Sequence, residues 1–149
     1  MKNALLSVLS ILLVSNSLIA QPTVDDFEAR SYTLNIYNFT LPYRLFIPDN
    51  YDGGQSYPLV IFLHGASDRG SDNRRHITRG ALVWARPENQ TVNPCFVLAP
   101  QCPQEMRWAN FGGTDCSMPM QMTLDVVDSL LLEFNIDPDR IHITGFSMG

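Results

Sequence analysis

The last nine residues constrain the fold of this chain more than any other part of its sequence. Residues 141–144 (IHIT) are rich in β-branched side chains and predict a strand, which leads directly into 145–149 (GFSMG). This G-x-S-x-G pattern is typical of a sharp turn from a strand into a helix, which holds a serine hydroxyl clear of the sheet. Glycines flank the serine because the strained turn leaves no room for side chains beside it. The sequence therefore predicts that Ser147 is a nucleophile, supported by Gly145 and Gly149.

Two earlier segments, 58–64 (PLVIFLH) and 95–99 (CFVLA), are apolar along almost their whole length. Parallel strands have this composition when helices cover both faces of the sheet. Upstream, the alternating residues 30–38 and the run 42–48 predict an antiparallel hairpin.

Two helices are expected between the later strands. A short helical stretch near 77–86 should stop at Pro87. A longer helix, capped by Ser117, should place apolar residues along one face. These residues are Leu124, Val126, Val127, Leu130, Leu131 and Phe134. The turn 137–139 should end this helix, with Arg140 opening the last strand. Strands alternating with helices after a hairpin predict an α/β fold with a mostly parallel sheet and flanking helices.

Residues 1–20 have the layout of a secretory signal peptide. Lys2 gives a positive start, 4–14 are apolar except for two serines, and 15–20 offer a cleavage region with small residues. The apolar stretch is shorter than the about 20 residues that a transmembrane helix needs. We therefore expect a secreted or periplasmic protein, without stable membrane insertion after cleavage, whose folded domain spans 21–149.

The charge of the chain disfavours two kinds of partner. Fifteen acidic residues against ten basic ones give a formal net charge of −5, and every acidic residue follows position 20. Nucleic acids and anionic membranes reward clustered positive charge, so we expect neither as a partner.

Three cysteines, Cys95, Cys102 and Cys116, leave two interpretations open. In an oxidising compartment, Cys102 and Cys116 could close a loop worth roughly 3 kcal/mol, and Cys95 would need another partner. Three unrelated buried thiols fit the sequence equally well, because connectivity does not follow from sequence. No cysteine or histidine spacing typical of a zinc site occurs, so no metal is expected.

A second chemical element, His64-Gly65-Ala66, ends the first long apolar run. Acyl transfer through a serine builds negative charge on a carbonyl oxygen, and two preset backbone N–H groups must receive that charge. One belongs to the residue after the nucleophile, and the other to the loop after an earlier central strand. We expect these groups to be the N–H of Met148 and the N–H of Ala66, with Gly65 letting the chain turn closely.

No histidine of the sequence fits the role of catalytic base. In this architecture the base follows the serine along the chain, whereas all three histidines precede it. We expect His64 to hydrogen-bond the loop backbone. His142 should be packed within the last strand, and His76 should lie on the surface.

The loop after the His-Gly strand is crowded with charges of both signs: Asp68, Arg69, Asp72, Arg74, Arg75 and Arg79. It should lie at the carboxyl end of the sheet, where α/β proteins bind ligands. Mixed charge of this density more often forms a solvated surface that pairs with itself, and contact with substrate is the alternative. For Trp108, packing in the core or a loop is expected rather than a substrate-binding wall.

Taken together, these stretches resemble the α/β-hydrolase superfamily, and within it secreted esterases of the phospholipase/carboxylesterase or "predicted peptidase" type. The matching segments are 41–51, 57–73, 96–103 and 136–149. The resemblance implies an eight-strand sheet, Ser147 as nucleophile, and the N–H groups of Ala66 and Met148 as the oxyanion hole. It also implies an aspartate and a histidine that follow the serine. Because neither position exists here, we expect an incomplete α/β-hydrolase domain, the N-terminal half, with no useful turnover by itself.

The function expected from this resemblance is hydrolysis of small-molecule carboxylic esters by acyl transfer through Ser147, without a cofactor. Two alternatives stay open. One is a serine peptidase of the prolyl-oligopeptidase kind, and the other is a secreted binding domain that keeps the fold without catalysis.

Overall fold

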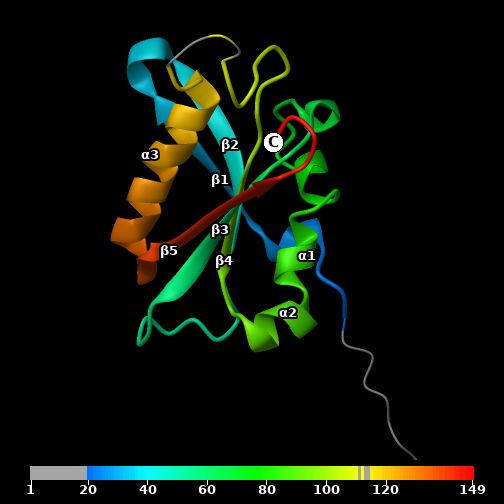
Figure 1. Cartoon of the computed structure of the whole chain (residues 1–149), viewed down its shortest axis with the longest axis vertical. Helices are drawn as coiled ribbons and strands as arrows, with labels where there is room; N and C mark the ends of the chain where they lie inside the picture. Colours follow the sequence, from blue (N-terminus) through cyan, green and yellow to red (C-terminus); the bar gives the residue numbers. More distant parts are fainter. Residues whose placement is uncertain (1–19, 111, 113–114) are drawn as a thin grey trace, which may run out of the picture.

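Five strands form one mixed sheet in the order β1-β2-β4-β3-β5 (Figure 1). The structure is a computed structural model that describes residues 20–110, 112 and 115–149. The strands are β1 Glu28–Leu34, β2 Phe39–Phe46, β3 Tyr57–Leu63, β4 Phe96–Pro100 and β5 Ile136–Gly145. The α-helices are α1 Leu82–Ala85, α2 Pro87–Val92 and α3 Met118–Glu133. The 3-10 turns in the described residues are η1 Val24–Asp26, η2 Asn35–Tyr37, η3 Ala66–Asp68 and η4 Arg75–Ile77.

Strand pairing confirms the predicted α/β fold. β1 and β2 form the expected antiparallel hairpin, and β2 also pairs antiparallel with β4. β3 pairs parallel with β4 on one side and with β5 on the other. The carboxyl ends of β3, β4 and β5 therefore share one edge of the sheet, which brings their following loops together.

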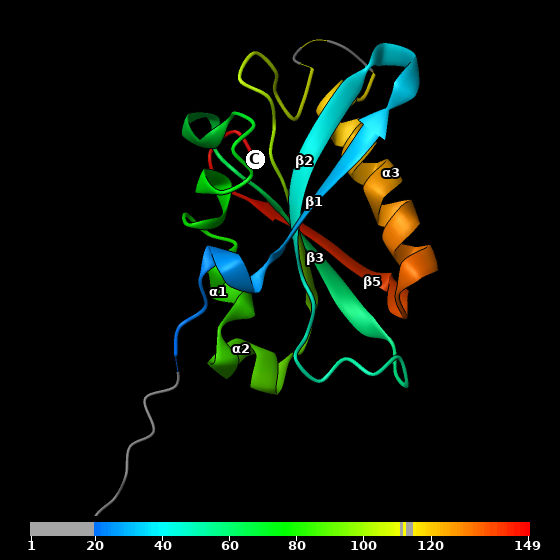
Figure 2. The ribbon, with the colours of Figure 1, turned by 180° about the vertical axis from the view of Figure 1, so that it is seen from behind.

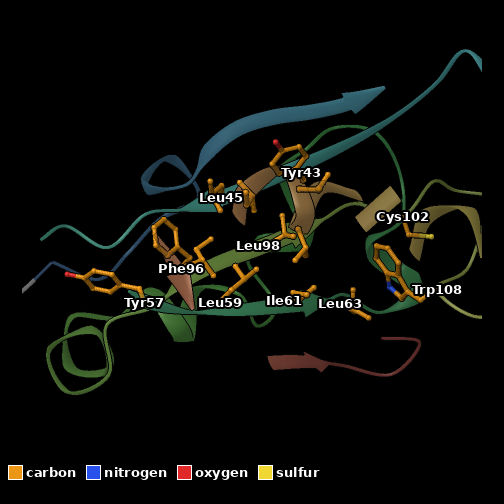
Figure 3. Packing of buried hydrophobic residues seen from close by; sticks show 14 residues of the cluster. Tyr43, Leu45, Tyr57, Leu59, Ile61, Leu63, Phe96, Leu98, Cys102 and Trp108 are labelled. Carbon is orange, nitrogen blue, oxygen red and sulfur yellow. The ribbon is translucent and has the colours of Figure 1, made fainter. Parts of the chain in front are cut away.

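Helices cover the two faces of the sheet, with α3 on one face and α1 and α2 on the other (Figures 1 and 2). Successive side chains of a strand point to opposite faces. Accordingly, Leu59, Ile61 and Leu63 of β3 enter the cluster beneath α3, which Figure 3 shows. Val60 and Phe62 enter the second cluster, on the side of α1. Burial on both faces explains why this strand is apolar throughout.

The amino end of α3 forms as predicted. The Ser117 hydroxyl accepts a hydrogen bond from the N–H of Met120 at 3.3 Å. The same hydroxyl donates to the carbonyl oxygen of Trp108 at 2.6 Å, so the cap also ties the preceding loop to the helix.

The buried face of α3 differs in part from the predicted one. Val126, Val127 and Leu130 are buried as expected, but Leu124 is 39% exposed. Met122 and Thr123 are buried instead, since the helix is rotated towards these positions when it packs on the sheet.

The predicted boundary between α3 and the last strand is wrong. The helix ends at Glu133, and β5 begins at Ile136 rather than at Arg140. Ile136 pairs with Tyr57, and regular pairing resumes at Ile141 opposite Leu59, after a register shift. Pro138 is tolerated here because this irregular stretch does not need its missing N–H.

The expected helix over 77–86 is also broken up. It consists of the turn η4 and the short helix α1, and Pro87 begins α2 as well as ending the preceding segment. Proline suits the first turn of a helix because an N–H there has no partner within the helix.

The predicted signal peptide lies outside the described residues, except for Ala20. Within the described ranges, no helix has the length and apolar character to cross a membrane.

Candidate active site

Ser147 sits in a strained turn directly after β5. Its φ is +58°, in the left-handed region that non-glycine residues rarely adopt. The turn is fixed by two backbone hydrogen bonds: Phe146 N–H donates to Leu63 O at 3.1 Å, and Gly149 N–H donates to Phe146 O at 3.0 Å. Ser147 itself is exposed. The local sequence thus produces the presented serine that the motif predicts.

The two glycines of the motif have a steric reason. A Cβ atom on Gly145 would lie 2.4 Å from the carbonyl carbon of Gly149. A Cβ atom on Gly149 would lie 1.9 Å from the carbonyl oxygen of Leu63. Both neighbours are backbone atoms that cannot swing aside, so the turn needs glycine at both positions.

The His-Gly loop lies beside this turn, because β3 and β5 are parallel neighbours. A Cβ atom on Gly65 would lie 3.4 Å from Cβ of Ser147 and 3.2 Å from Cδ1 of Phe146. Ala66 begins the turn η3 and is exposed, whereas Met148 packs partly buried against the main core. The fold thus brings the segment of Ala66 and the segment of Ser147 to one place at the sheet edge.

His64 is buried and hydrogen-bonds the loop backbone through both ring nitrogens, as predicted. Its Nε2 accepts from the N–H of Cys102 at 2.9 Å, so the ring proton is on Nδ1, which donates to Gly65 O at 2.7 Å. Burial lowers the pKa of His64, and the hydrogen bond to Gly65 offsets this only in part. The indole N–H of Trp108 donates to His64 O at 3.0 Å, which confirms a packing role for Trp108.

The prediction for His76 is wrong, and the prediction for His142 is right in its strand but wrong in its packing. His76 is fully buried rather than on the surface, and its Nε2 donates to Ala99 O at 3.0 Å. Burial lowers the pKa of His76 to about 4. His142 lies within β5 as expected, but its side chain is exposed because β5 is an outer strand of the described sheet.

The charged loop after β3 pairs mostly with itself, as predicted. Arg75 pairs with Asp72, and Arg79 Nε lies 3.1 Å from Oδ1 of Asp68. Asp68, however, is 3% exposed, so this carboxylate is not part of a solvated surface. Its second oxygen, Oδ2, has no hydrogen-bond partner.

Two polar residues that hold the backbone of this region, one buried and one partly buried, were missed by the sequence analysis. Gln101 is fully buried directly after β4, and its amide bonds to the backbone of Asp68 and Asn73. Asn73 has a φ of +51° and donates through Nδ2 to Arg30 O and Tyr43 O. A glutamine between the apolar strand and Cys102 was the available signal, because polar residues in such a position need partners.

All three cysteines are described and free: Cys95 and Cys102 are buried, and Cys116 is exposed. Burial raises the pKa of the Cys102 thiol to about 12, which disfavours the reactive thiolate. Among the residues with assigned positions, no three histidine, cysteine or carboxylate side chains are grouped so as to hold a metal ion.

Comparison with known proteins points to esterases, although no protein-family profile matches the chain. A probable feruloyl esterase C of Aspergillus terreus is 29% identical over 133 residues, which are 87% of this chain and 43% of that protein. A thermostable esterase of known structure is 43% identical with a TM-score of 0.79, over 85% of this chain and 36% of that one.

A more distant structure supports the fold. A ferulic acid esterase of Anaeromyces mucronatus, solved in complex with ferulic acid, is 16% identical with a TM-score of 0.55. The match covers 82% of this chain and 48% of that structure. The chain thus spans less than half the length of these relatives, and its sheet has the fold class of the α/β hydrolases.

Proposed function

We propose that the protein hydrolyses carboxylic esters through Ser147. The main support for this proposal is that Ser147 is exposed, has a left-handed backbone conformation, and lies against Gly65 of the His-Gly loop. A strained serine beside a second loop whose backbone can supply an N–H donor is the arrangement that acyl transfer needs. The three relatives described above are named as esterases, which supports the same chemistry.

In the proposed reaction, the hydroxyl oxygen of Ser147 attacks the ester carbonyl, and its proton passes to a histidine base. The N–H groups of Ala66 and Met148 stabilise the negative charge on the carbonyl oxygen. The alcohol leaves with a proton, and water then hydrolyses the acyl-serine to release the acid. No cofactor takes part.

The base is not one of the histidines in this sequence. Both ring nitrogens of His64 are engaged beneath the loop, and His76 is buried with its Nε2 on Ala99 O. His142 lies on the strand five positions before Ser147. We therefore propose that residues beyond these 149 supply the base and its orienting acid, and that the 149-residue chain alone does not turn over.

The test uses protein expressed from the complete reading frame. Ser147→Ala should abolish hydrolysis of p-nitrophenyl acetate and labelling by a fluorophosphonate probe. Ser129→Ala should change neither, since Ser129 is an exposed serine on α3 whose hydroxyl bonds to Asp125 O. Labelling that survives in Ser147→Ala would overturn the proposal.

Substrate choice is part of the same assay. A feruloyl ester is included because of the relatives' names, and a proline-containing peptide tests the alternative peptidase activity. Faster cleavage of the peptide than of either ester would replace the esterase proposal by the peptidase one.

We also propose that residues 1–20 export the protein, on the basis of their sequence pattern. N-terminal sequencing of the exported protein should begin near Gln21. An N-terminus at Met1 on the exported protein would contradict this.

A further inference from the structure

The direction of the Ala66 N–H depends on the preceding carbonyl group. The peptide bonds of the described chain are trans, and in a trans peptide the C=O and the following N–H point in opposite directions. Gly65 O is held by Nδ1–H of His64 at 2.7 Å and by the N–H of Asp68 at 3.1 Å. Fixing this oxygen on the inner side therefore aims the N–H of Ala66 outward, away from His64.

The position of Asp68 depends in turn on Gln101. Nε2 of Gln101 donates to Asp68 O at 3.1 Å, and Oε1 accepts from the N–H of Asn73 at 2.6 Å. One buried side chain thus holds both ends of the loop 68–73. Each end of the amide faces a partner of the required kind, so the amide cannot be reversed or replaced by a carboxylate without losing a bond.

The backbone around Gln101 anchors this support to the sheet. Gln101 N–H donates to Pro42 O at 2.8 Å, which ties it to β2. The next residue, Cys102, donates to Nε2 of His64 and accepts from Gly70 N–H at 3.0 Å. The end of β4 therefore supports the His-Gly loop from below through both residues.

We propose that Gln101 is a positioning residue for the oxyanion-hole N–H of Ala66, acting through Asp68 and the carbonyl group of Gly65. This inference rests on the proposed esterase function. Gln101 does not touch the reacting groups. It would set the geometry on which the rate depends, because oxyanion donors must be preset before charge develops.

Gln90 provides a matched control at the other end of β4. It also bridges backbone groups through its amide, donating to Trp84 O at 2.8 Å and accepting from Cys95 N–H at 3.2 Å. Gln90→Glu and Gln101→Glu therefore make the same chemical change before and after the same strand. Gln101→Met keeps the length of the side chain and removes both bonds.

The experiment compares these variants in the protein whose activity requires Ser147. Loss of a whole oxyanion donor costs about 10²–10³ in rate, so a misaimed donor should lower kcat about 10–100-fold. KM should change less than about 2-fold, and affinity for a boronic acid that forms a tetrahedral adduct with the serine should fall with kcat. Gln90→Glu should leave kcat and boronate affinity unchanged.

The outcomes separate this inference from the proposed function. Activity that persists in Ser147→Ala refutes the function. If activity requires Ser147 but kcat is unchanged in Gln101→Glu and Gln101→Met, only the role of Gln101 is refuted. Equal losses of kcat in the Gln90 and Gln101 variants, or failure of both Gln101 variants to fold, would show a merely structural role and also overturn it.

Discussion

The two ends of the sheet use polar contacts in different ways. At the carboxyl end, several polar side chains are almost fully buried, among them His64, Asp68, His76 and Gln101. At the amino end, the polar contacts are only partly buried, as at Gln90, or lie at the surface. Asn135 N–H donates to the Tyr51 hydroxyl at 2.8 Å, and Arg140 pairs with Asp137 at 2.7 Å, with both Asn135 and Arg140 exposed.

This difference has an energetic meaning. Buried polar groups stabilise a fold only when paired with the correct geometry, and leaving one unpaired costs about 1–3 kcal/mol. Within the described ranges, the buried side-chain atoms without a partner are Asp68 Oδ2, Asn73 Oδ1 and His76 Nδ1, all in the loop at the carboxyl end. Such departures from optimal stability are typical of functional sites, whereas exposed pairs at the amino end tolerate change.

The largest difference between the two ends should come from their tryptophans. Trp108→Ala should cost about 3–5 kcal/mol, since it empties a buried site and removes the donor to His64 O. Trp84→Ala, near the amino end, should cost less because Trp84 is only partly buried. Urea denaturation measures both, and an equal or larger loss in Trp84→Ala would break the comparison.

The next effect concerns the stability of the protein in acid. His76 keeps a pKa of about 4 when folded, against 6.5 when unfolded, so the unfolded state binds the proton first. The free energy of unfolding should therefore fall as the pH drops from about 6.5 to about 4, by about 3 kcal/mol from this group. His76→Gln should reduce the pH dependence of the urea unfolding midpoint across this range. If the urea midpoint depends on pH equally in the variant and the parent protein, the lowered pKa of His76 is contradicted.

The smallest effect tests the glycines of the two ends. Gly149→Ala should cost about 1–3 kcal/mol, because its Cβ would meet the carbonyl oxygen of Leu63. Gly54→Ala, at the amino end, should stay within about 0.5 kcal/mol, since its nearest neighbour is the flexible carboxylate of Asp52 at 3.1 Å. Thermal unfolding compares the two, and a harmless Gly149→Ala would show that the turn at Ser147 is less constrained than its geometry indicates.

Much of the fold followed from local patterns. The hairpin, the buried strands, the Ser117 cap and the turn at Ser147 each depend on residues within a few positions of one another. The burial of His76 did not follow, because it depends on Ala99, which lies 23 positions away. The rotation of α3 likewise depends on the sheet against which it packs.

The candidate site divides in the same way. The sequence by itself determined where the chain bends sharply and which residues flank the bend, since backbone strain and glycine sterics act between neighbours. Only the tertiary structure decided that Gln101 supports the loop of Asp68, 33 positions away, because parallel strands bring distant loops to one edge. Hydrogen bonds between such loops form only after the sheet has assembled, so no local pattern records them.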